Sequence, residues 1–297
     1  MKRLLILAAA ATLCLTATAQ KRITFPQEVS GADETITLWD NTSAPHSTGE
    51  TKDEVIVKNH RLARTSSTDF YLFKAAADKA TGHSIAIFPG GGYQTVNLSF
   101  GYARYLADCG ITAMVVKYRV PNFGHWEAPL EDAMAAVRWL RTNAERLGID
   151  PKKVGVAGSS AGGHLASWVS NAMPDEEKPA FAVLHYPVID GTLLSSKSQN
   201  ETLRRLLGND RTSVDIERFS THNMVTPQTP PTMLLHSYDD YLATVANSIA
   251  YYKALKRHGV RATMHFYPDG AHGWVSSTKY HYVEHWHQRM VEWIRLF

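Results

Sequence analysis

Residues 153–162 read Lys-Val-Gly-Val-Ala-Gly-Ser-Ser-Ala-Gly, and this stretch decides the fold class. Its apolar first half predicts a buried strand, and residues 161–170 predict a helix. Gly158 to Gly162 match the pattern G-x-S-x-G, in which a serine lies on a sharp turn between a strand and a helix. The chain crowds such a turn on both sides, so only glycine fits at the flanking positions. The stretch therefore predicts that Ser160 is a nucleophile at the tip of the turn.

Short apolar runs and helical patterns alternate on both sides of this stretch. This alternation predicts an α/β fold with a mostly parallel central sheet and helices on both faces. In such sheets, ligands bind beyond the carboxyl ends of the strands. Glu131 and Asp132 stand where acids favour the start of a helix. The expected strands are 84–88, 113–118, 153–157, 181–186, 232–236 and 262–267, and the expected helices are 101–108, 130–147, 161–170, one after strand 232–236 that ends at 255, and 282–296.

Two further regions flank or interrupt this core. Residues 20–80 are polar and rich in turns, and we expect their three strand-like runs to be antiparallel strands at the sheet edge. Residues 191–231 form the one sizeable insertion, with a small helix expected beside the site at 203–208. We therefore expect a single domain over residues 20–297. The three strand-like runs are 36–39, 54–57 and 69–73.

The first residues have the pattern of a secretory signal peptide. Two basic residues follow Met1, an apolar run ends at Leu15, and an A-x-A site ends at Ala19. The apolar run is shorter than the roughly 20 residues that a membrane span requires. We expect cleavage after Ala19 and a secreted or periplasmic protein. An uncleaved anchor and lipidation of Cys14 are the less favoured alternatives.

Composition narrows the classes of partner. The formal charge is +3, and loss of Lys2 and Arg3 with the leader leaves +1. This balance predicts binding neither to nucleic acid nor to a charged membrane surface. After cleavage Cys109 stands alone, so no internal disulfide can form and we expect it to be a small buried residue. The oligomeric state stays open.

A glycine-rich loop follows the first core strand. Pro89 is followed by three glycines and Tyr93, which resembles the loop whose backbone amides help to build an oxyanion hole in lipases and esterases. Proline replaces the usual histidine, which removes a side chain and leaves the amides. We predict that Gly91, Gly92 and Ala161 donate to the oxyanion. A phosphate-binding loop is disfavoured because no G-K-[ST] follows.

The acid and the base of a triad are expected after two later strands. His236-Ser237-Tyr238-Asp239-Asp240 ends one strand, and the acid that orients the histidine belongs there. A strand-end histidine four positions before the acid favours Asp240, with Asp239 as the alternative and the other acid left as a solvated turn residue.

Gly270-Ala271-His272-Gly273 follows the last strand. A histidine in a loop flanked by glycine can reach over the nucleophile, and we predict that His272 is the general base. The chain order Ser160, Asp240, His272 matches the order found in one large hydrolase superfamily.

Together these motifs resemble the α/β-hydrolase superfamily across residues 83–297. More narrowly, the chain looks like bacterial acetyl-xylan-esterase-like hydrolases, a group that also holds feruloyl-esterase-like proteins. The loop after Asp240 departs from these relatives, because it reads Tyr-Leu-Ala-Thr where they usually have a Val-Pro pair. The matching stretches are 88–93, 128–133, 158–166, 230–240, 247–248 and 270–273.

The resemblance implies an α/β-hydrolase fold and the removal of small acyl groups, acetyl above all, from plant polysaccharides. The substrate would be an acylated carbohydrate, and no cofactor or metal is expected. The modest size of the insertion suggests a short lid, which favours small acyl groups over long lipids. A serine peptidase or amidase on the same fold, and a carbohydrate-binding protein on an inactive hydrolase scaffold, are the alternatives.

Other signals are weaker. Four aromatic residues near the motif loops are candidates for stacking on a sugar. His281 to His285 spell the metal pattern H-x-x-E-H, with two histidines expected on one helix face. We set this pattern aside because a metal site needs a further protein ligand. His164 is expected to pack beneath the site. The four aromatic candidates are Tyr93, Trp126, Tyr241 and Trp274.

Overall fold

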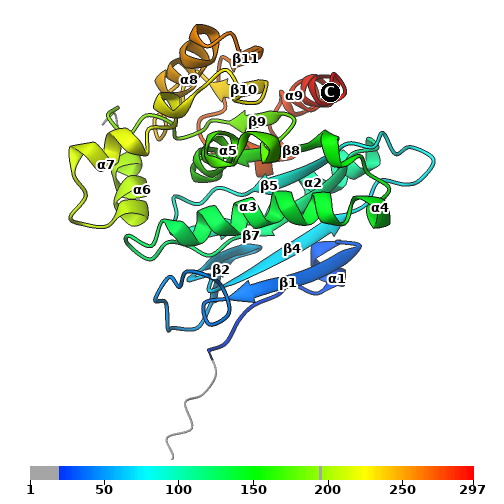
Figure 1. Cartoon of the computed structure of the whole chain (residues 1–297), viewed down its shortest axis with the longest axis horizontal. Coiled ribbons are helices and arrows are strands. Elements are labelled where there is room, and N and C mark those ends of the chain that lie inside the picture. Colours follow the sequence, from blue (N-terminus) through cyan, green and yellow to red (C-terminus); the bar gives the residue numbers. More distant parts are fainter. Residues whose placement is uncertain (1–19, 194–195) are drawn as a thin grey trace, which may run out of the picture.

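The computed structural model describes residues 20–193 and 196–297. The predicted leader, with Cys14 and the cleavage site, lies outside these residues. The described residues form an eight-stranded sheet, a three-stranded sheet and helices around them (Figure 1). Within the described part of the chain, no helix is both long and apolar enough to span a bilayer.

The large sheet has the strand order β1-β4-β7-β5-β8-β9-β10-β11. The six strands from β7 to β11 in this order are parallel, and most of their residues are buried because helices cover both faces. β1 and β4 are antiparallel at one edge, as expected. The strands are β1 (Glu34–Asp40), β4 (Ser67–Phe73), β5 (Ser84–Phe88), β7 (Thr112–Lys117), β8 (Val154–Ser159), β9 (Ala182–His185), β10 (Thr232–Ser237) and β11 (Ala262–Tyr267).

Helices cover the two faces of this sheet (Figure 1). α3, α5 and α8 pack on one face, while α2 and α9 pack on the other, where the Tyr102 hydroxyl contacts the Met290 sulfur at 2.8 Å. α5 is buried over most of its length because it packs against the sheet, against α3 and against the 3₁₀ turn at Thr221–Met224. The helices are α1 (Gln27–Ser30), α2 (Phe100–Asp108), α3 (Glu127–Thr142), α4 (Ala144–Leu147), α5 (Ala161–Ala172), α6 (Lys197–Leu207), α7 (Ser213–Arg218), α8 (Ala246–Arg257) and α9 (Val283–Ile294).

One of the predicted N-terminal edge strands lies elsewhere. The second run forms β2 (Val55–Lys58), which pairs with β3 (Arg61–Ala63) and not with the large sheet. β6 (Thr95–Asn97) completes this small sheet. Such short strands carry no periodic pattern, so the sequence could not assign their partners. A buried ion trio ties this region to the large sheet, because the Lys117 ammonium lies 2.8 Å from Glu54 and 2.9 Å from Asp69.

The start of α3 also differs from the prediction. The helix begins at Glu127 and not at Leu130, so Asp132 lies in its second turn and does not start it. Asp132 is fully buried and accepts hydrogen bonds from the backbone and side chain of Arg119, the closest from Nη2 at 2.7 Å. The acids that seemed to favour a helix start are therefore the partners of a buried arginine.

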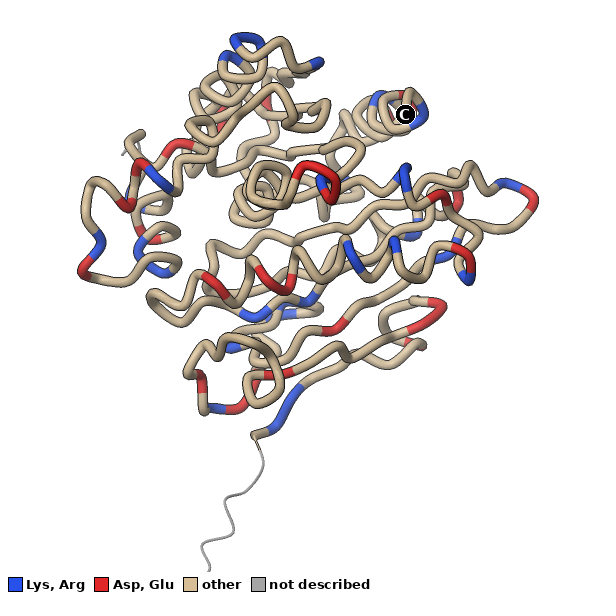
Figure 2. Tube along the Cα trace, viewed as in Figure 1, with Lys and Arg blue, Asp and Glu red and all other residues tan. Residues whose placement is uncertain are grey.

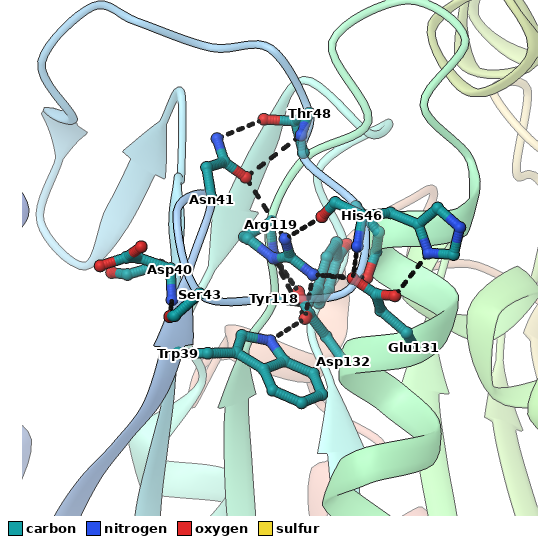
Figure 3. Close-up of polar contacts among 12 residues, drawn as sticks. Trp39, Asp40, Asn41, Ser43, His46, Thr48, Tyr118, Arg119, Glu131 and Asp132 are labelled. Carbon is teal, nitrogen blue, oxygen red and sulfur yellow. Dashed lines mark hydrogen bonds and ion pairs between the residues drawn. The ribbon is translucent and has the colours of Figure 1, made fainter.

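We call the side chains around this arginine the Arg119 cluster (Figure 3). The Trp39 indole nitrogen donates to Asp132 at 2.6 Å, and Arg119 also donates to Glu131 and to the His46 carbonyl, each at 2.5 Å. The cluster thereby joins the end of β7 to α3 and to the N-terminal segment. Its members are Trp39, Asn41, His46, Arg119, Glu131 and Asp132.

The chain between β9 and β10 forms the predicted insertion. α6, α7 and a short 3₁₀ turn (Thr221–Met224) lie along it, and α6 and α7 project together at one side of the molecule (Figure 1). α6 begins at Lys197, earlier than the helix expected near residue 203. The insertion lies at the carboxyl end of the parallel strands, where it borders the site described next.

Candidate active site

Ser160 lies on the turn between β8 and α5, as the motif predicts. Its backbone has φ +55° and ψ −119°, a conformation that costs a non-glycine residue about 1–3 kcal/mol. Three backbone hydrogen bonds hold it, since the Ser160 amide donates to the His185 carbonyl at 3.0 Å and its carbonyl accepts from the amides of His164 at 3.0 Å and Val188 at 3.2 Å. A side chain at Gly158 or Gly162 would come within 2.0 Å of a backbone oxygen. The two motif glycines are therefore required by close packing.

Ser160, His272 and Asp240 form one chain of hydrogen bonds. Nε2 of His272 lies 2.8 Å from Oγ of Ser160, and Nδ1 lies 2.6 Å from Oδ2 of Asp240. The three side chains come from loops after β8, β11 and β10, whose carboxyl ends meet at one edge of the sheet. This is the geometry of a nucleophile, a base and an orienting acid.

Asp240 is held from several sides. Its Oδ1 accepts from the amides of Leu242 at 2.9 Å and Ala243 at 3.0 Å, and its Oδ2 also lies 3.3 Å from Nε2 of His236. Burial acts to raise the pKa of Asp240, but hydrogen bonds from His236 and His272 outweigh it and lower the pKa to about 2. Asp240 therefore stays ionised and can stabilise a protonated imidazole.

Asp239, the alternative acid, has a different place. Its carboxylate accepts from the Ala271 amide at 2.8 Å and the Gly270 amide at 3.3 Å, and it makes no contact with the His272 ring. As expected of the second acid, Asp239 is exposed and lies in a turn. Asp239 supports the backbone of the loop that carries His272.

The glycine loop lies beside Ser160. The Gly90 amide donates to the Ser159 hydroxyl at 3.1 Å, which ties the loop to the turn. Within residues 20–193 and 196–297, the amides of Gly91 and Gly92 make no backbone hydrogen bond, and both glycines line the cavity in front of Ser160. Ala161 is buried, and its amide, as the first of α5, has no intrahelical acceptor. These three amides are thus available to an oxyanion.

Ser160 and His272 line a cavity of about 660 Å³. A second cavity of about 270 Å³ shares three lining residues with it, which are Asn97, Ser99 and Ser276. The hydroxyls of Ser99 and Ser276 lie 2.7 Å apart at this junction. The two cavities therefore adjoin, and polar side chains line most of the first.

Sequence reasoning missed several residues of this cavity. Tyr186 follows β9, and its ring centre lies 4.7 Å from that of His272. The rule that ligands bind at strand carboxyl ends could have found it, because β9 lies next to β8. The wall formed by α6 carries no local signal, since it depends on how the insertion packs. The α6 residues that line the cavity are Lys197, Ser198, Glu201, Thr202 and Arg205.

The aromatic candidates do not line the cavity. Tyr93 is buried, and its hydroxyl lies 2.9 Å from Nδ1 of His164. Trp274 is buried among rings that include Tyr186, at 4.9 Å. Trp126 stacks on Trp168, and Tyr241 is exposed outside the cavity. The first three of these residues therefore pack against neighbouring side chains and do not take the expected place beside a sugar.

Two other histidine signals are explained by local contacts. His164 packs beneath the site as expected, with Nε2 2.8 Å from the Phe219 carbonyl. The H-x-x-E-H residues do not share a helix face, because α9 begins only at Val283. His281 lies 3.2 Å from Asp269, and His285 lies 3.2 Å from the Tyr267 hydroxyl. No group of three or more potential metal ligands occurs among the residues that the structure describes.

Comparisons with known proteins agree with this architecture. A family model described as "alpha/beta hydrolase fold" matches residues 86–276. An acetylxylan esterase of Xylanibacter ruminicola is 34% identical over 225 residues, which are 73% of this chain and 46% of that protein. Endo-1,4-beta-xylanase B of Butyrivibrio fibrisolvens is 29% identical over 63% of this chain and 32% of that protein. This chain thus spans a third to a half of these relatives.

A solved structure gives a closer match in length. The acetyl ester-xyloside bifunctional hydrolase of Caldicellulosiruptor lactoaceticus superposes with a TM-score of 0.71 and 34% sequence identity. The match covers 77% of this chain and 88% of that one. The likeness therefore extends over about three quarters of this chain.

Proposed function

The chain belongs to the α/β-hydrolase fold family, and from this premise we propose that it is a serine carboxylic-ester hydrolase. Its substrates would be plant-type polysaccharides or oligosaccharides that carry small acyl groups, acetyl above all. The observation that carries the proposal is the chain of hydrogen bonds from Asp240 through His272 to Ser160, with Ser160 facing a cavity.

The proposed reaction follows from this geometry. Nε2 of His272 takes the proton of the Ser160 hydroxyl, and Oγ attacks the ester carbonyl. The amides of Gly91, Gly92 and Ala161 hold the oxyanion of the tetrahedral intermediate. As the intermediate collapses and the bond between the acyl carbon and the sugar oxygen breaks, the imidazolium gives its proton to that oxygen, and the sugar leaves with a free hydroxyl. Water, activated by the same imidazole, releases the acid from the acyl-enzyme.

Asp240 would act through His272 alone. Its carboxylate accepts from Nδ1 and so keeps Nε2 directed at Ser160. Because its pKa is lowered to about 2, it remains an anion while the imidazole gains and loses its proton. Tyr186, whose ring lies against the His272 ring, limits how far the imidazole can tilt.

The carbohydrate substrate rests on two further observations. The cavity is lined mostly by polar and charged side chains, which suits a sugar better than a long acyl chain. The adjoining second cavity offers room for a neighbouring unit of a polymer. The relatives named acetylxylan esterase and acetyl ester-xyloside hydrolase support the same substrate class.

Export from the cytoplasm is part of the same proposal. The pattern of residues 1–19 is typical of a secretory leader, and polysaccharides lie outside the cell. The exported protein would then begin at Gln20. Sequencing its first residue checks this, and an intact Met1 on the exported protein would contradict it.

The test compares residues 20–297 with the Ser160→Ala variant. Each is incubated with acetylated xylan, with a feruloylated oligosaccharide and with aryl esters of rising chain length. We expect release of acetate by the wild type and a loss of roughly 10⁴-fold or more in the variant. Equal rates in both proteins would remove Ser160 as nucleophile. Cleavage of peptide amides but not of esters would favour the peptidase alternative.

A further inference from the structure

Cationic side chains gather at the cavity in front of Ser160. Arg61, Lys197 and Arg205 all line it, the first from the small sheet and the other two from α6. Glu201 is the only acid among the lining residues that the structure describes. The charge balance at the cavity is therefore positive.

Glu201 does not neutralise these cations fully. Its two oxygens accept from Arg204, which lies outside the lining, at 2.7 Å from Nη2 and at 3.1–3.2 Å from Nε. Arg205 is more distant, with Nη2 3.8 Å from the Glu201 carboxylate. Since Arg204 already compensates the one acid, the three lining cations keep most of their charge.

The two arginines are positioned by neutral partners. Nη1 of Arg205 donates to the Gly92 carbonyl at 3.2 Å, and Nε of Arg61 donates to the Thr95 hydroxyl at 2.8 Å. These bonds orient the guanidinium groups and leave other N–H groups unused. Neither Arg61 nor Lys197 has an ion-pair partner in residues 20–193 and 196–297. Among the described lining residues, the cavity thus offers more cationic donors than its single acid, Glu201, can receive.

The start of α6 adds to this charge. Lys197 and Ser198, the first two residues of the helix, both line the cavity. The amino end of a helix carries a partial positive charge and favours anions. Elsewhere along the described part of the chain, basic and acidic residues are interspersed (Figure 2).

We propose that the cavity recognises a carboxylate carried by the glycan close to the ester, so that the preferred substrates are acylated oligosaccharides with a uronic-acid unit. This inference rests on the proposed esterase function. A guanidinium offers parallel donors that match the two oxygens of a carboxylate. Arg205 contacts the glycine loop directly, so a carboxylate bound there would hold the sugar next to the reacting ester.

The test uses two acetylated xylo-oligosaccharides of equal length, one with a glucuronic-acid branch and one without. We expect kcat/KM to be about tenfold higher or more for the branched substrate, as charge-assisted hydrogen bonds allow. Added salt should reduce this preference. Arg61→Gln and Lys197→Gln should each reduce the ratio of the two kcat/KM values, and the double variant should reduce it most. Arg257→Gln, the same charge change on α8 outside the cavity, is the control and should keep the ratio.

A binding measurement separates this inference from the proposed function. Titration calorimetry of the Ser160→Ala variant with the unacetylated branched and linear oligosaccharides needs no catalysis. Tighter binding of the branched sugar supports the inference even if the wild type cleaves no ester, a result that would overturn only the esterase. Equal binding of both sugars together with equal kcat/KM would overturn the inference and leave the esterase intact.

Discussion

Asp132 and Asp240 are both buried carboxylates beside a nitrogen base, yet they belong to regions of opposite character. Asp132 accepts from Arg119, whose other side-chain donors go to the remaining acceptors of the Arg119 cluster and to the Ala128 carbonyl (Figure 3). Asp240 meets an imidazole whose far nitrogen reaches Ser160 at the cavity. A guanidinium keeps its proton at any physiological pH, whereas an imidazole exchanges it. The comparison indicates that a buried carboxylate can contribute to catalysis when its partner is able to exchange a proton with a third group.

The backbone around the two acids differs as well. The Arg119 cluster is built on the end of β7 and on a regular helix, α3. The residues around Asp240 include three non-glycine residues at positive φ, which are Ser160, Tyr186 and Ala271. Strained backbone persists only where the surroundings hold it firmly. We therefore expect the Arg119 cluster to act mainly on stability, and the residues around Asp240 to hold a constrained backbone geometry.

The largest effect should come from replacing Asp240, and this replacement tests the role of the region around His272 and Ser160. Asp240→Asn would present an amide to Nδ1 and favour the wrong tautomer of His272, so we expect kcat to fall roughly 10⁴-fold. Asp239→Asn is the matched control, with a loss below about tenfold because one acceptor oxygen remains for the loop amides. Initial rates on an aryl acetate measure both. Similar losses in the two variants would contradict our choice of acid.

The second-largest effect tests whether the Arg119 cluster stabilises the fold. Arg119→Met would leave the Asp132 carboxylate buried without its partner, and we expect the free energy of unfolding to fall by about 3–5 kcal/mol. Thermal melts should show Tm lowered by roughly 10 °C. In the double variant with Asp132→Leu, part of the loss should return because no buried charge remains. An unchanged Tm in Arg119→Met would mean that the cluster contributes little to stability.

The smallest effect concerns the loss of folding stability on acidification. Near pH 5 we expect this loss to come from buried histidines and not from Asp240. Burial lowers the pKa of His185 to about 3 from an ordinary 6.5. The unfolded chain therefore binds a proton that the folded protein refuses, and stability falls as the pH drops below 6.5. Asp240, with its pKa lowered from 3.8 to about 2, loses its contribution only below pH 3.8.

His185→Phe removes this titration and keeps a ring among Tyr102, Trp274 and Trp286. Urea unfolding at pH 7.5 and pH 5.0 should show a loss of stability on acidification that is smaller by about 2 kcal/mol than in the wild type. The same loss in both proteins would assign the acid sensitivity to other groups.

The sequence predicted the parts of the molecule that depend on local backbone geometry. Ser160 and His272 lie after strand ends where glycines permit sharp turns. Each of these motifs can be recognised in a stretch of at most five residues. The hydrogen bonds now add geometry to the order in which the motifs occur. Asp240 was separated from Asp239 only by a spacing argument, and the structure gives the two acids distinct contacts.

Other features depend on packing between distant segments and could not be predicted. An acid early in a helix favours its amino end in most sequences, so Asp132 gave no sign of its buried arginine. Trp274 is close to His272 in the chain, but its burial beneath the loop follows from α9 and β11. Arg61 joins the cavity through a strand of three residues, too short for any periodic signal.

Residues that line the cavity from α6 lie on a different element from the residues that react with the substrate. The reacting groups stand on loops at the ends of sheet strands, while one face of a single inserted helix supplies much of the charged lining. Substrate preference is therefore modular. Exchanging residues 191–231 for the equivalent segment of a relative should change substrate preference, provided that the new segment keeps the contacts to the Gly92 carbonyl and to His164.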